Sequence, residues 1–354
     1  MKHKLSHIVR RKKVQSAVKS DASQQELAPR ITNETIATHR EEVIGSARKY
    51  IYRGRHTKHQ IVVISTTLFI TTLVLLFSYC TLALYRFQSS SAFLYHVTQV
   101  FPFPIARAGS NFVAYENYLF ELRHYTHYYE VQQKLDFNNE SGKQQLAEFR
   151  KRALDKVIND AYVKQLASKY KVSVSNKEIN YQIDIVRDQN RLGSSDKVFE
   201  DVLKDYWGWS VDDFKRSLRQ QLLAQKVVAV LDTTTRTKAE TALNELKSGV
   251  DFVAVAKKYS DDEATKANGG DLGFLIDKTN HDLPAQTTGA LFKLQPGQYS
   301  DIVNIGYALV IVKNNEFSGD KVRGSHILFT FKDINSYIND LKDKQKARTY
   351  ISVN

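Results

Sequence analysis

The chain has 354 residues, of which 42% are apolar, enough for a sizeable hydrophobic core and for two or three domains. Its single cysteine, Cys80, excludes an intramolecular disulfide, a CxxC redox pair and a cysteine-rich zinc site. A formal charge of +13 is compatible with a nucleic-acid partner, but this depends on where along the chain the charge lies.

Most of the positive charge lies near the N-terminus. Residues 1–60 hold fourteen Lys and Arg against five acids, which gives +9 and leaves +4 for the other 294 residues. The run Arg10 to Lys13 has no stacking aromatic or groove-reading motif beside it, whereas attraction to anionic lipid headgroups explains the basic cluster before residue 60. We therefore predict a partly disordered cytoplasmic tail over 1–60 that contacts membrane lipids, and no nucleic-acid partner.

An uncharged stretch of twenty-five residues, 61–85, follows the tail. As a helix it would reach about 37 Å, enough for a hydrocarbon layer of about 30 Å. Three cations, Arg53, Arg55 and Lys58, precede the stretch and only Arg86 closely follows it. The positive-inside rule therefore predicts a single-pass protein of the cell membrane with a cytoplasmic N-terminus and extracytoplasmic C-terminal domains.

Residues 86–103 read as a linker, and the region 104–231 reads as a mainly helical domain. Apolar residues recur at helical spacing over 146–166, and capping boxes at Ser175 and Ser210 predict two further helix starts. His124 and His127 lie three residues apart on one predicted helix, but no third ligand is evident, so we predict no metal site.

From residue 232 the pattern changes to short helices and strands separated by glycine-rich loops. Thr237 and Glu240 form a capping pattern that predicts a helix ended by Gly249, and Asp251 can cap a second short helix. The loop Gly269-Gly270-Asp271-Leu272-Gly273-Phe274 and a strand over 306–313 come next. This pattern is typical of an α/β domain, which we assign to residues 232–332, so the whole chain is predicted to be α+β.

Specific residues of this second domain carry a family resemblance. The run DFVAVAKKYSDDEATKANGGDLGF, followed by ALFKLQPGQYSDIV and GYALVIVKN, resembles the parvulin family of peptidyl-prolyl cis-trans isomerases. The earlier runs ALDKVINDAYVKQLASKYKVSVSNKEI and SVDDFKRSLRQQLLAQKVV resemble the N-terminal chaperone domain of SurA- and PrsA-type extracytoplasmic foldases. This resemblance agrees with the outward topology that the charge distribution predicts.

The order of the chain departs from the parvulin pattern. Parvulins begin with a central strand that carries a His-Ile-Leu motif, but here His326-Ile327-Leu328 comes after the last expected strand. A late segment can fill the same position in a sheet, because hydrogen bonding and burial decide where a strand lies. We expect this permuted strand rather than a truncated second parvulin repeat, and we expect 333–354 to return and complete the helical domain.

The resemblance implies residues for catalysis, which turns a peptide bond over a barrier of about 18–20 kcal/mol without breaking it. It needs an apolar socket for the proline ring and a polar interior that favours the twisted amide, and it implies no cofactor. The catalytic positions fall on His326 and Asp262, and the socket positions fall on Leu272, Phe274, Leu283 and Phe292.

Four matched positions depart from an active parvulin. The second family histidine is Ala308, the socket phenylalanine falls near Thr287, and two hydroxyl positions fall on Val303 and Ile305. We expect a membrane-anchored foldase that binds unfolded secreted or membrane polypeptides and their proline-containing segments, with isomerase activity weakened by these losses. The alternatives are a noncatalytic holdase with a degenerate parvulin domain and a membrane-tethered interaction protein.

Overall fold

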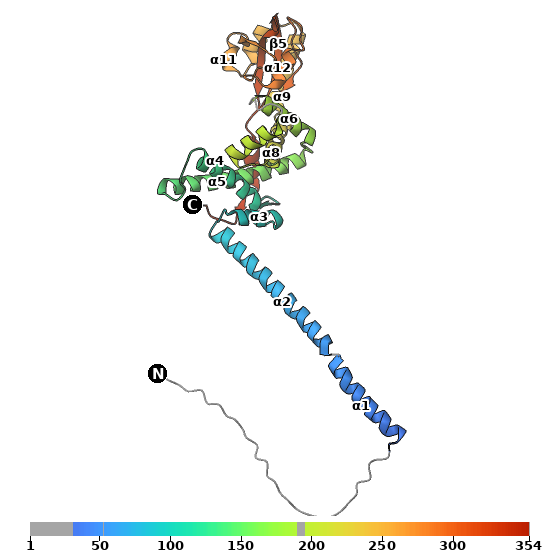
Figure 1. Cartoon of the computed structure of the whole chain (residues 1–354). Helices are drawn as coiled ribbons and strands as arrows, with labels where there is room; N and C mark the ends of the chain where they lie inside the picture. The colour runs from blue at the N-terminus through green and yellow to red at the C-terminus, as the bar shows by residue number, and fades with distance from the viewer. Residues whose placement is uncertain (1–30, 52, 190–194, 354) are drawn as a thin grey trace, which may run out of the picture. The chain divides into compact units, whose positions relative to one another are not determined.

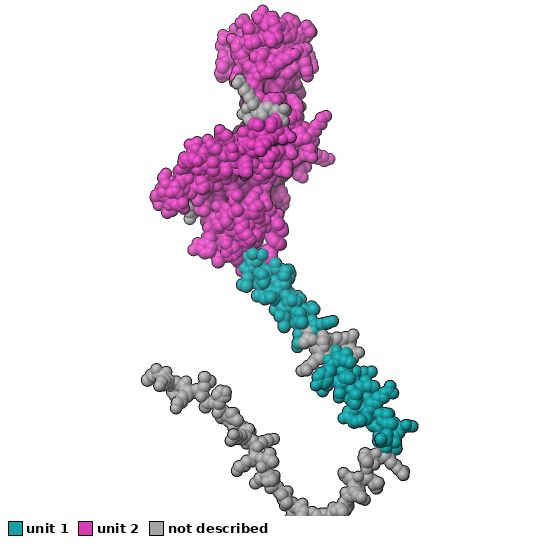
Figure 2. All heavy atoms as spheres, viewed as in Figure 1, with its two compact units in different colours: residues 1–76 teal, residues 77–354 magenta. Residues whose placement is uncertain are grey.

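The computed structural model describes residues 31–51, 53–189 and 195–353 (Figure 1). The part of the tail before residue 31, where we predicted disorder, lies outside the described residues. The chain divides into two compact units, Met1–Leu76 and Phe77–Asn354, which Figure 2 distinguishes by colour.

The described residues of the first unit are helical from Asn33 onward. Its elements are α1 (Asn33–Ile51) and most of α2 (Arg53–Thr81), which ends in a π-helical turn, η1 (Leu82–Arg86). Among the described residues, the stretch Lys58–Arg86 is the one helical segment long and apolar enough to cross a membrane. It contains the predicted span 61–85, and it fits a membrane anchor.

The second unit begins with a mainly helical part. Its helices are α3 (Ala92–Val100), α4 (Tyr115–Val131), α5 (Glu140–Lys169), α6 (Asn176–Gln189), α7 (Asp196–Trp207) and α8 (Val211–Leu231). The predicted capping box at Ser210 is present, because its hydroxyl accepts from the Asp213 N–H while the Asp213 carboxylate accepts from the Ser210 N–H. The segment 86–103, for which we expected a linker, contains α3.

The C-terminal end of the chain returns to this helical part. Helix α13 (Ile334–Lys344) packs against α5 and α8, and β7 (Arg348–Thr349) pairs antiparallel with β1 (Pro104–Ala108). Strand β2 (Asn111–Ala114) pairs with the other side of β1, so the order of this small sheet is β2-β1-β7. Residues from both ends of the second unit therefore share one sheet.

The α/β part lies between these two helical segments along the chain. Its elements are α9 (Thr233–Lys247), α10 (Phe252–Tyr259), α11 (Glu263–Lys266), β3 (Asp271–Ile276), α12 (Ala285–Leu291), β4 (Val303–Asn304), β5 (Ala308–Ser318) and β6 (Lys321–Thr330). Helix α9 begins four residues before the start that we predicted at Thr237, because the Asp232 carboxylate rather than Thr237 accepts from the first turn of the helix.

Strand β6 lies in the interior of an antiparallel sheet whose order is β3-β6-β5-β4. Cross-strand partners include Val312 with His326 on one side of β6 and Leu275 with Arg323 on the other. The prediction that the His-Ile-Leu strand enters the sheet from the C-terminal side is confirmed. A sheet without this strand would leave β3 and β5 unpaired along their inner edges.

Helices cover both faces of this sheet. Leu309, Ile311, Ile327 and Phe329 pack with residues of α9 and α10 on one face. The alternate positions of β5, Ala308, Val310 and Val312, lie on the other face, where they pack in one cluster with Leu291 of α12. The period-two alternation along β5 therefore separates two hydrophobic clusters, and both are needed because the strand is buried on each face.

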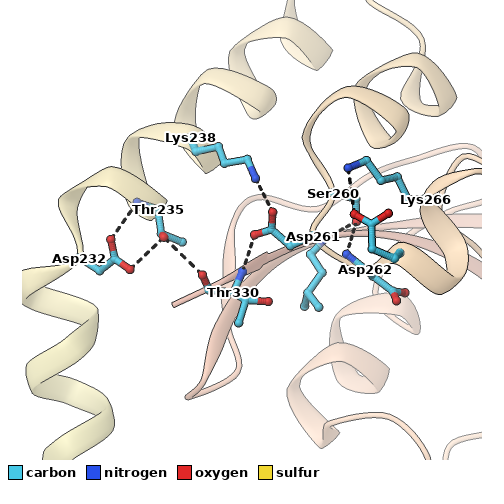
Figure 3. Close-up of polar contacts among 10 residues, drawn as sticks. Asp232, Thr235, Lys238, Ser260, Asp261, Asp262, Lys266 and Thr330 are labelled. Atoms are coloured by element: carbon cyan, nitrogen blue, oxygen red, sulfur yellow. Dashed lines mark hydrogen bonds and ion pairs between the residues drawn. The ribbon is translucent and has the colours of Figure 1, made fainter. Parts of the chain in front are cut away.

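The connection between the helical part and the α/β part is held by one buried carboxylate, Asp232 (Figure 3). It accepts from the N–H of Thr235 at 3.1 Å, from the Thr235 hydroxyl at 2.9 Å and from the N–H of Lys332 at 2.9 Å. Burial by itself raises the pKa of Asp232, but these hydrogen bonds outweigh it and hold the pKa below its usual value. The segment that leads into α9 and the segment that leaves β6 are thus joined at one residue.

Candidate active site

His326 lies in the middle of β6 and is 8% exposed. Its cross-strand partner is Val312, which packs in the cluster beneath α12, so the imidazole projects from the α12 face of the sheet. The neighbouring residue Ile327 packs on the opposite face against α9 and α10. The alternation of the strand therefore sets the direction of the histidine.

The loop Ser260-Asp261-Asp262 follows α10 and docks onto the C-terminal half of β6 (Figure 3). The Asp261 N–H donates to the Leu328 carbonyl at 2.7 Å, and the Leu328 N–H donates to the Ser260 hydroxyl oxygen at 3.2 Å. The Asp261 carboxylate accepts from the Thr330 N–H at 2.9 Å and also pairs with Lys238 of α9. The loop thus pairs with β6 beyond the point where its pairing with β3 stops, and this places Asp262 next to His326.

Asp262, Thr265 and His326 form a closed triangle of polar contacts. The Asp262 Oδ2 atom lies 2.7 Å from His326 Nε2 and 2.6 Å from Thr265 Oγ1, and the latter two atoms lie 3.2 Å apart. Burial raises the pKa of Asp262, but hydrogen bonds from Thr265 and His326 outweigh it and the net pKa is below its usual value. The carboxylate is therefore ionised at neutral pH.

The ionised state of Asp262 determines the hydrogen positions in the triangle. A carboxylate only accepts hydrogen bonds, so the Nε2 atom of His326 carries a hydrogen and donates it to Asp262. The Thr265 hydroxyl likewise donates to Asp262, which directs its lone pairs toward the His326 N–H. The imidazole and the carboxylate are thus fixed in orientation before any ligand arrives.

Gly270 supports the histidine from the neighbouring loop. Its carbonyl accepts from the His326 N–H at 2.8 Å, which extends the hydrogen bonding between β3 and β6 by one residue. Gly270 has a φ of +82°, and a Cβ atom built on it would lie 2.1 Å from the His326 carbonyl oxygen. Only glycine fits this close approach, so the Gly-Gly pair of the sequence motif has a steric role.

The predicted socket residues separate into two groups. Leu272, Leu283 and Phe292 lie together in the hydrophobic cluster on the α12 face, which is also the face of His326. Phe274 lies outside this cluster and is 38% exposed. The register of β3 shifts between Asp271 and Leu275, and a bulge of this kind turns side chains away from the alternation that the sequence suggests.

The positions that depart from the parvulin pattern are filled by packed residues. Ala308 and Thr287 are fully buried, and Ile305 is buried in the cluster on the α12 face. Val303 packs against the same cluster. No second imidazole faces the triangle from position 308, and Thr265 instead supplies the third polar group.

Thr265 was missed in the sequence analysis. It lies three residues after Asp262 in the four-residue helix α11, and Asp262 caps that helix by accepting from the Ala264 N–H at 3.2 Å. The signal available in the sequence was the spacing Asp-x-x-Thr, which brings two side chains together on the first turn of a helix. That spacing becomes informative only once α11 is known to exist.

The second region with notable ring contacts surrounds His124 in α4. Its imidazole stacks on Trp209 with ring centroids 4.3 Å apart, and burial lowers the pKa of His124 to about 4. His127 contacts the Asp205 carbonyl instead. Within the ranges that the structure describes, no group of three His, Cys, Asp or Glu side chains could hold a metal ion.

Comparison with protein families matches the chain from within α2 through the helical part and most of the α/β part. A model described as the PPIC-type PPIase domain matches residues 225–316, and a model of the SurA-like N-terminal domain matches residues 55–228. The chain therefore joins a SurA-like N-terminal domain to a parvulin-type peptidyl-prolyl cis-trans isomerase domain. It is similar to proteins named as the foldase PrsA and the chaperones SurA and PpiD.

Individual relatives share modest identity with this chain. Foldase protein PrsA of Caldanaerobacter subterraneus subsp. tengcongensis is 28% identical over 232 residues, which cover 59% of this chain and 69% of the relative. Periplasmic chaperone PpiD of Escherichia coli K12 is 34% identical over 93 residues, covering 26% of this chain and 14% of the relative. A crystal structure of peptidylprolyl isomerase (PrsA) from Bacillus anthracis is 22% identical, covers 54% of this chain and 88% of that one, and has a TM-score of 0.18.

Proposed function

We propose that the site around Asp262 and His326 catalyses rotation about X-Pro peptide bonds in unfolded polypeptides. The observation that carries this proposal is the closed triangle of Asp262, Thr265 and His326 on the same sheet face as Leu272, Leu283 and Phe292. A fixed polar group beside an apolar surface is the combination that the reaction requires.

The chemistry assigns each residue a role. The apolar side chains Leu272, Leu283 and Phe292 take the pyrrolidine ring out of water and hold it while the acyl side turns. The Asp262 carboxylate, held by donors on both sides, presents a fixed field in which the twisted amide is favoured over the planar one. His326 positions this carboxylate and closes the polar side of the site.

The substrates are proline-containing segments of unfolded secreted or membrane polypeptides. Relatives named as foldases and chaperones support binding of unfolded polypeptide. The sequence places an excess of cations before the span and one arginine directly after it. By the positive-inside rule, the N-terminus is cytoplasmic and both C-terminal parts act outside the cytoplasm, where newly translocated chains emerge.

A protease-coupled assay with a proline tetrapeptide tests the catalytic proposal on the full chain in phospholipid nanodiscs. Asp262→Asn is the test variant and Glu263→Gln is its matched control, because the exposed Glu263 neighbours Asp262 and makes only a surface pair with Lys266. We expect a rate above background for the wild type and the control, and a loss of at least about tenfold for Asp262→Asn, which corresponds to about 1.4 kcal/mol.

The same samples separate catalysis from client binding. Suppressed aggregation of a denatured client should be unchanged by Asp262→Asn, because the substitution leaves the helical part intact. A wild-type rate equal to background at high protein concentration would overturn the isomerase proposal. Suppressed aggregation under those conditions would assign the chain to noncatalytic holdases.

A further inference from the structure

The chain that follows Arg86, at the end of the membrane span, is free of charge. The twenty residues from Phe87 to Ala106 contain no Asp, Glu, Lys or Arg, and Arg86 is the single such residue between Ile61 and Ala106. The whole chain has 25% charged residues, so twenty residues would carry about five at that frequency. A surface segment in water rarely loses all of its charges without another environment to contact.

Helix α3 occupies this uncharged segment and has two different faces. The Ser91 hydroxyl accepts from the Leu94 N–H and begins the helix. Leu94 and Thr98 are buried on the inner face, while Phe93 is 53% and Val100 is 71% exposed on the outer face. Residues 93 and 100 are seven apart, so they lie on one side of the helix.

Two further aromatic side chains extend this outer face. Phe87 before α3 is 68% exposed and Phe101 after it is 39% exposed. Phe87, Phe93, Val100 and Phe101 form an apolar surface that we call the α3 foot. Four large apolar residues exposed within fifteen positions exceed the scattered single residues that a soluble surface carries.

The α3 foot is continuous with the apolar surface of the span. The Phe93 ring lies 6.5 Å from the Tyr79 ring of α2, centroid to centroid, and the Phe101 ring lies 4.9 Å from the Phe77 ring in an edge-to-face arrangement. Phe77 and Tyr79 belong to the last two turns of α2. Where the end of α2 contacts the bilayer, the foot lies against the same boundary.

The inner side of the foot is joined firmly to the helical part. The Tyr115 hydroxyl of α4 donates to the Leu84 carbonyl at 2.7 Å, and the Tyr85 hydroxyl donates to the Pro104 carbonyl at 2.6 Å. The Arg123 guanidinium lies over the Tyr95 ring of α3 at 5.2 Å. These contacts join α3 and the turn η1 before it to α4 and β1 of the helical part.

We propose that the α3 foot inserts into the interfacial layer of the bilayer, beside the span, and sets the height and tilt of the helical part above the membrane. The inference rests on the membrane anchor of the proposed function. A lipid surface is the occupant that fits because the foot continues the apolar surface of α2 and has aromatic rings at its border, where membrane proteins place them.

Spin-label accessibility on the full chain in nanodiscs of neutral and anionic phospholipid tests this proposal. Labels are attached to Phe93→Cys and Val100→Cys in a Cys80→Ala background, one site at a time. Leu75→Cys on α2 reports the span, and Phe112→Cys on β2 reports an exposed apolar position away from the foot. The readout is relaxation by oxygen, which concentrates in lipid, relative to a water-soluble nickel chelate.

We expect a high ratio of oxygen to nickel accessibility at residues 75, 93 and 100, and a low ratio at residue 112. A high ratio at 75 with low ratios at 93 and 100 would overturn the foot and leave the anchor standing. A low ratio at 75 would overturn the anchor itself. Dipolar broadening between labels of two copies at residue 93, with low oxygen accessibility there, would assign the surface to a dimer and overturn lipid insertion.

Discussion

Gly270 lies behind the candidate site at a point where a side chain has no room. Its left-handed backbone brings the position of a Cβ atom to 2.1 Å from the His326 carbonyl oxygen. Its own carbonyl accepts from the His326 N–H at 2.8 Å. A methyl group at this position must therefore push β6 away at the residue that carries the imidazole.

Two effects set the size of the penalty for Gly270→Ala. The left-handed conformation costs an L-residue about 1–2 kcal/mol. Displacing β6 leaves the buried His326 N–H without its acceptor, which costs about 1–3 kcal/mol. We expect Gly270→Ala to lower the free energy of opening of the sheet by about 2–5 kcal/mol and to reduce isomerase activity.

Gly273, which lies three residues further along the chain in β3, provides a matched control. Its φ is +79°, close to that of Gly270, but no atom lies within 4 Å of the position of its Cβ. Gly273→Ala should therefore cost only the conformational part, about 1–2 kcal/mol. Hydrogen exchange of the β6 amides, measured on the full chain in nanodiscs, reports both free energies. Equal losses for the two variants would contradict this expectation, because the close approach to His326 would then contribute nothing.

Four other predictions follow from the same contacts. Thr265→Val should lower kcat/KM by about tenfold, which is about 1.4 kcal/mol. It should also shift the acid limb of the pH–activity profile to higher pH, because Asp262 loses a hydrogen bond that lowers its pKa. Thr265→Ser should restore both properties, and equal profiles for the two variants would contradict this role of the hydroxyl. Because the folded pKa of Asp262 lies below its unfolded value, the stability it contributes is present above the unfolded pKa and is lost as pH falls through the folded one. Activity measured against pH should therefore persist in mild acid and fall only below the usual carboxyl range. Asp232→Ala leaves the Lys332 N–H without its acceptor and should lower the calorimetric stability of the full chain by about 1–3 kcal/mol; an unchanged melting temperature would contradict the role of Asp232 at the junction. A chain ending at Gly319 lacks β6, so β5 amides should lose protection from exchange, while retained protection would mean that the sheet closes without β6.

The position of β6 could be predicted from the sequence because the His-Ile-Leu motif is recognisable and the sheet lacks a central strand without it. A His-Ile-Leu strand was absent from the start of the domain and present after its end, and the sheet needs one strand in that place. The matched isomerase model ends at residue 316, before β6, since a family model that follows chain order cannot include a permuted strand. The need to pair the inner edges of β3 and β5 therefore predicts β6, which the matched family model leaves out.

Details that depend on contacts between distant segments could not be predicted in this way. The start of α9 is set by Asp232, whose carboxylate also binds the N–H of Lys332, one hundred residues later. A local capping pattern at Thr237 cannot register such a contact. Phe274 would share a face with Leu272 in a regular strand, but the bulge in β3 turns it outward.

The spacing of residues along the sequence could not by itself predict all the polar groups of the candidate site. His326 reaches Asp262 because the loop after α10 hydrogen-bonds to Leu328 and Thr330, which extends the edge of β6 beyond β3. Thr265 joins them through a helix of four residues, too short to produce a periodic signal. The family resemblance therefore predicted Asp262 and His326 but not Thr265.

The permutation also links folding of the isomerase domain to the helical part. Strand β6 carries His326, and the segment that follows it returns at once through Lys332 to α13, which packs on α5 and α8. The segment that leaves the C-terminal end of β6 is thus tied both to the start of α9 through Asp232 and to the helical part through α13. Loss of order in α13 should therefore loosen β6 before it loosens β5, because β5 is tied to the rest of its sheet by β4 and the loops around Ser300. A histidine strand that came first in the domain would not lead into α13, so here we expect a change in the helical part to reach the candidate site through covalent continuity.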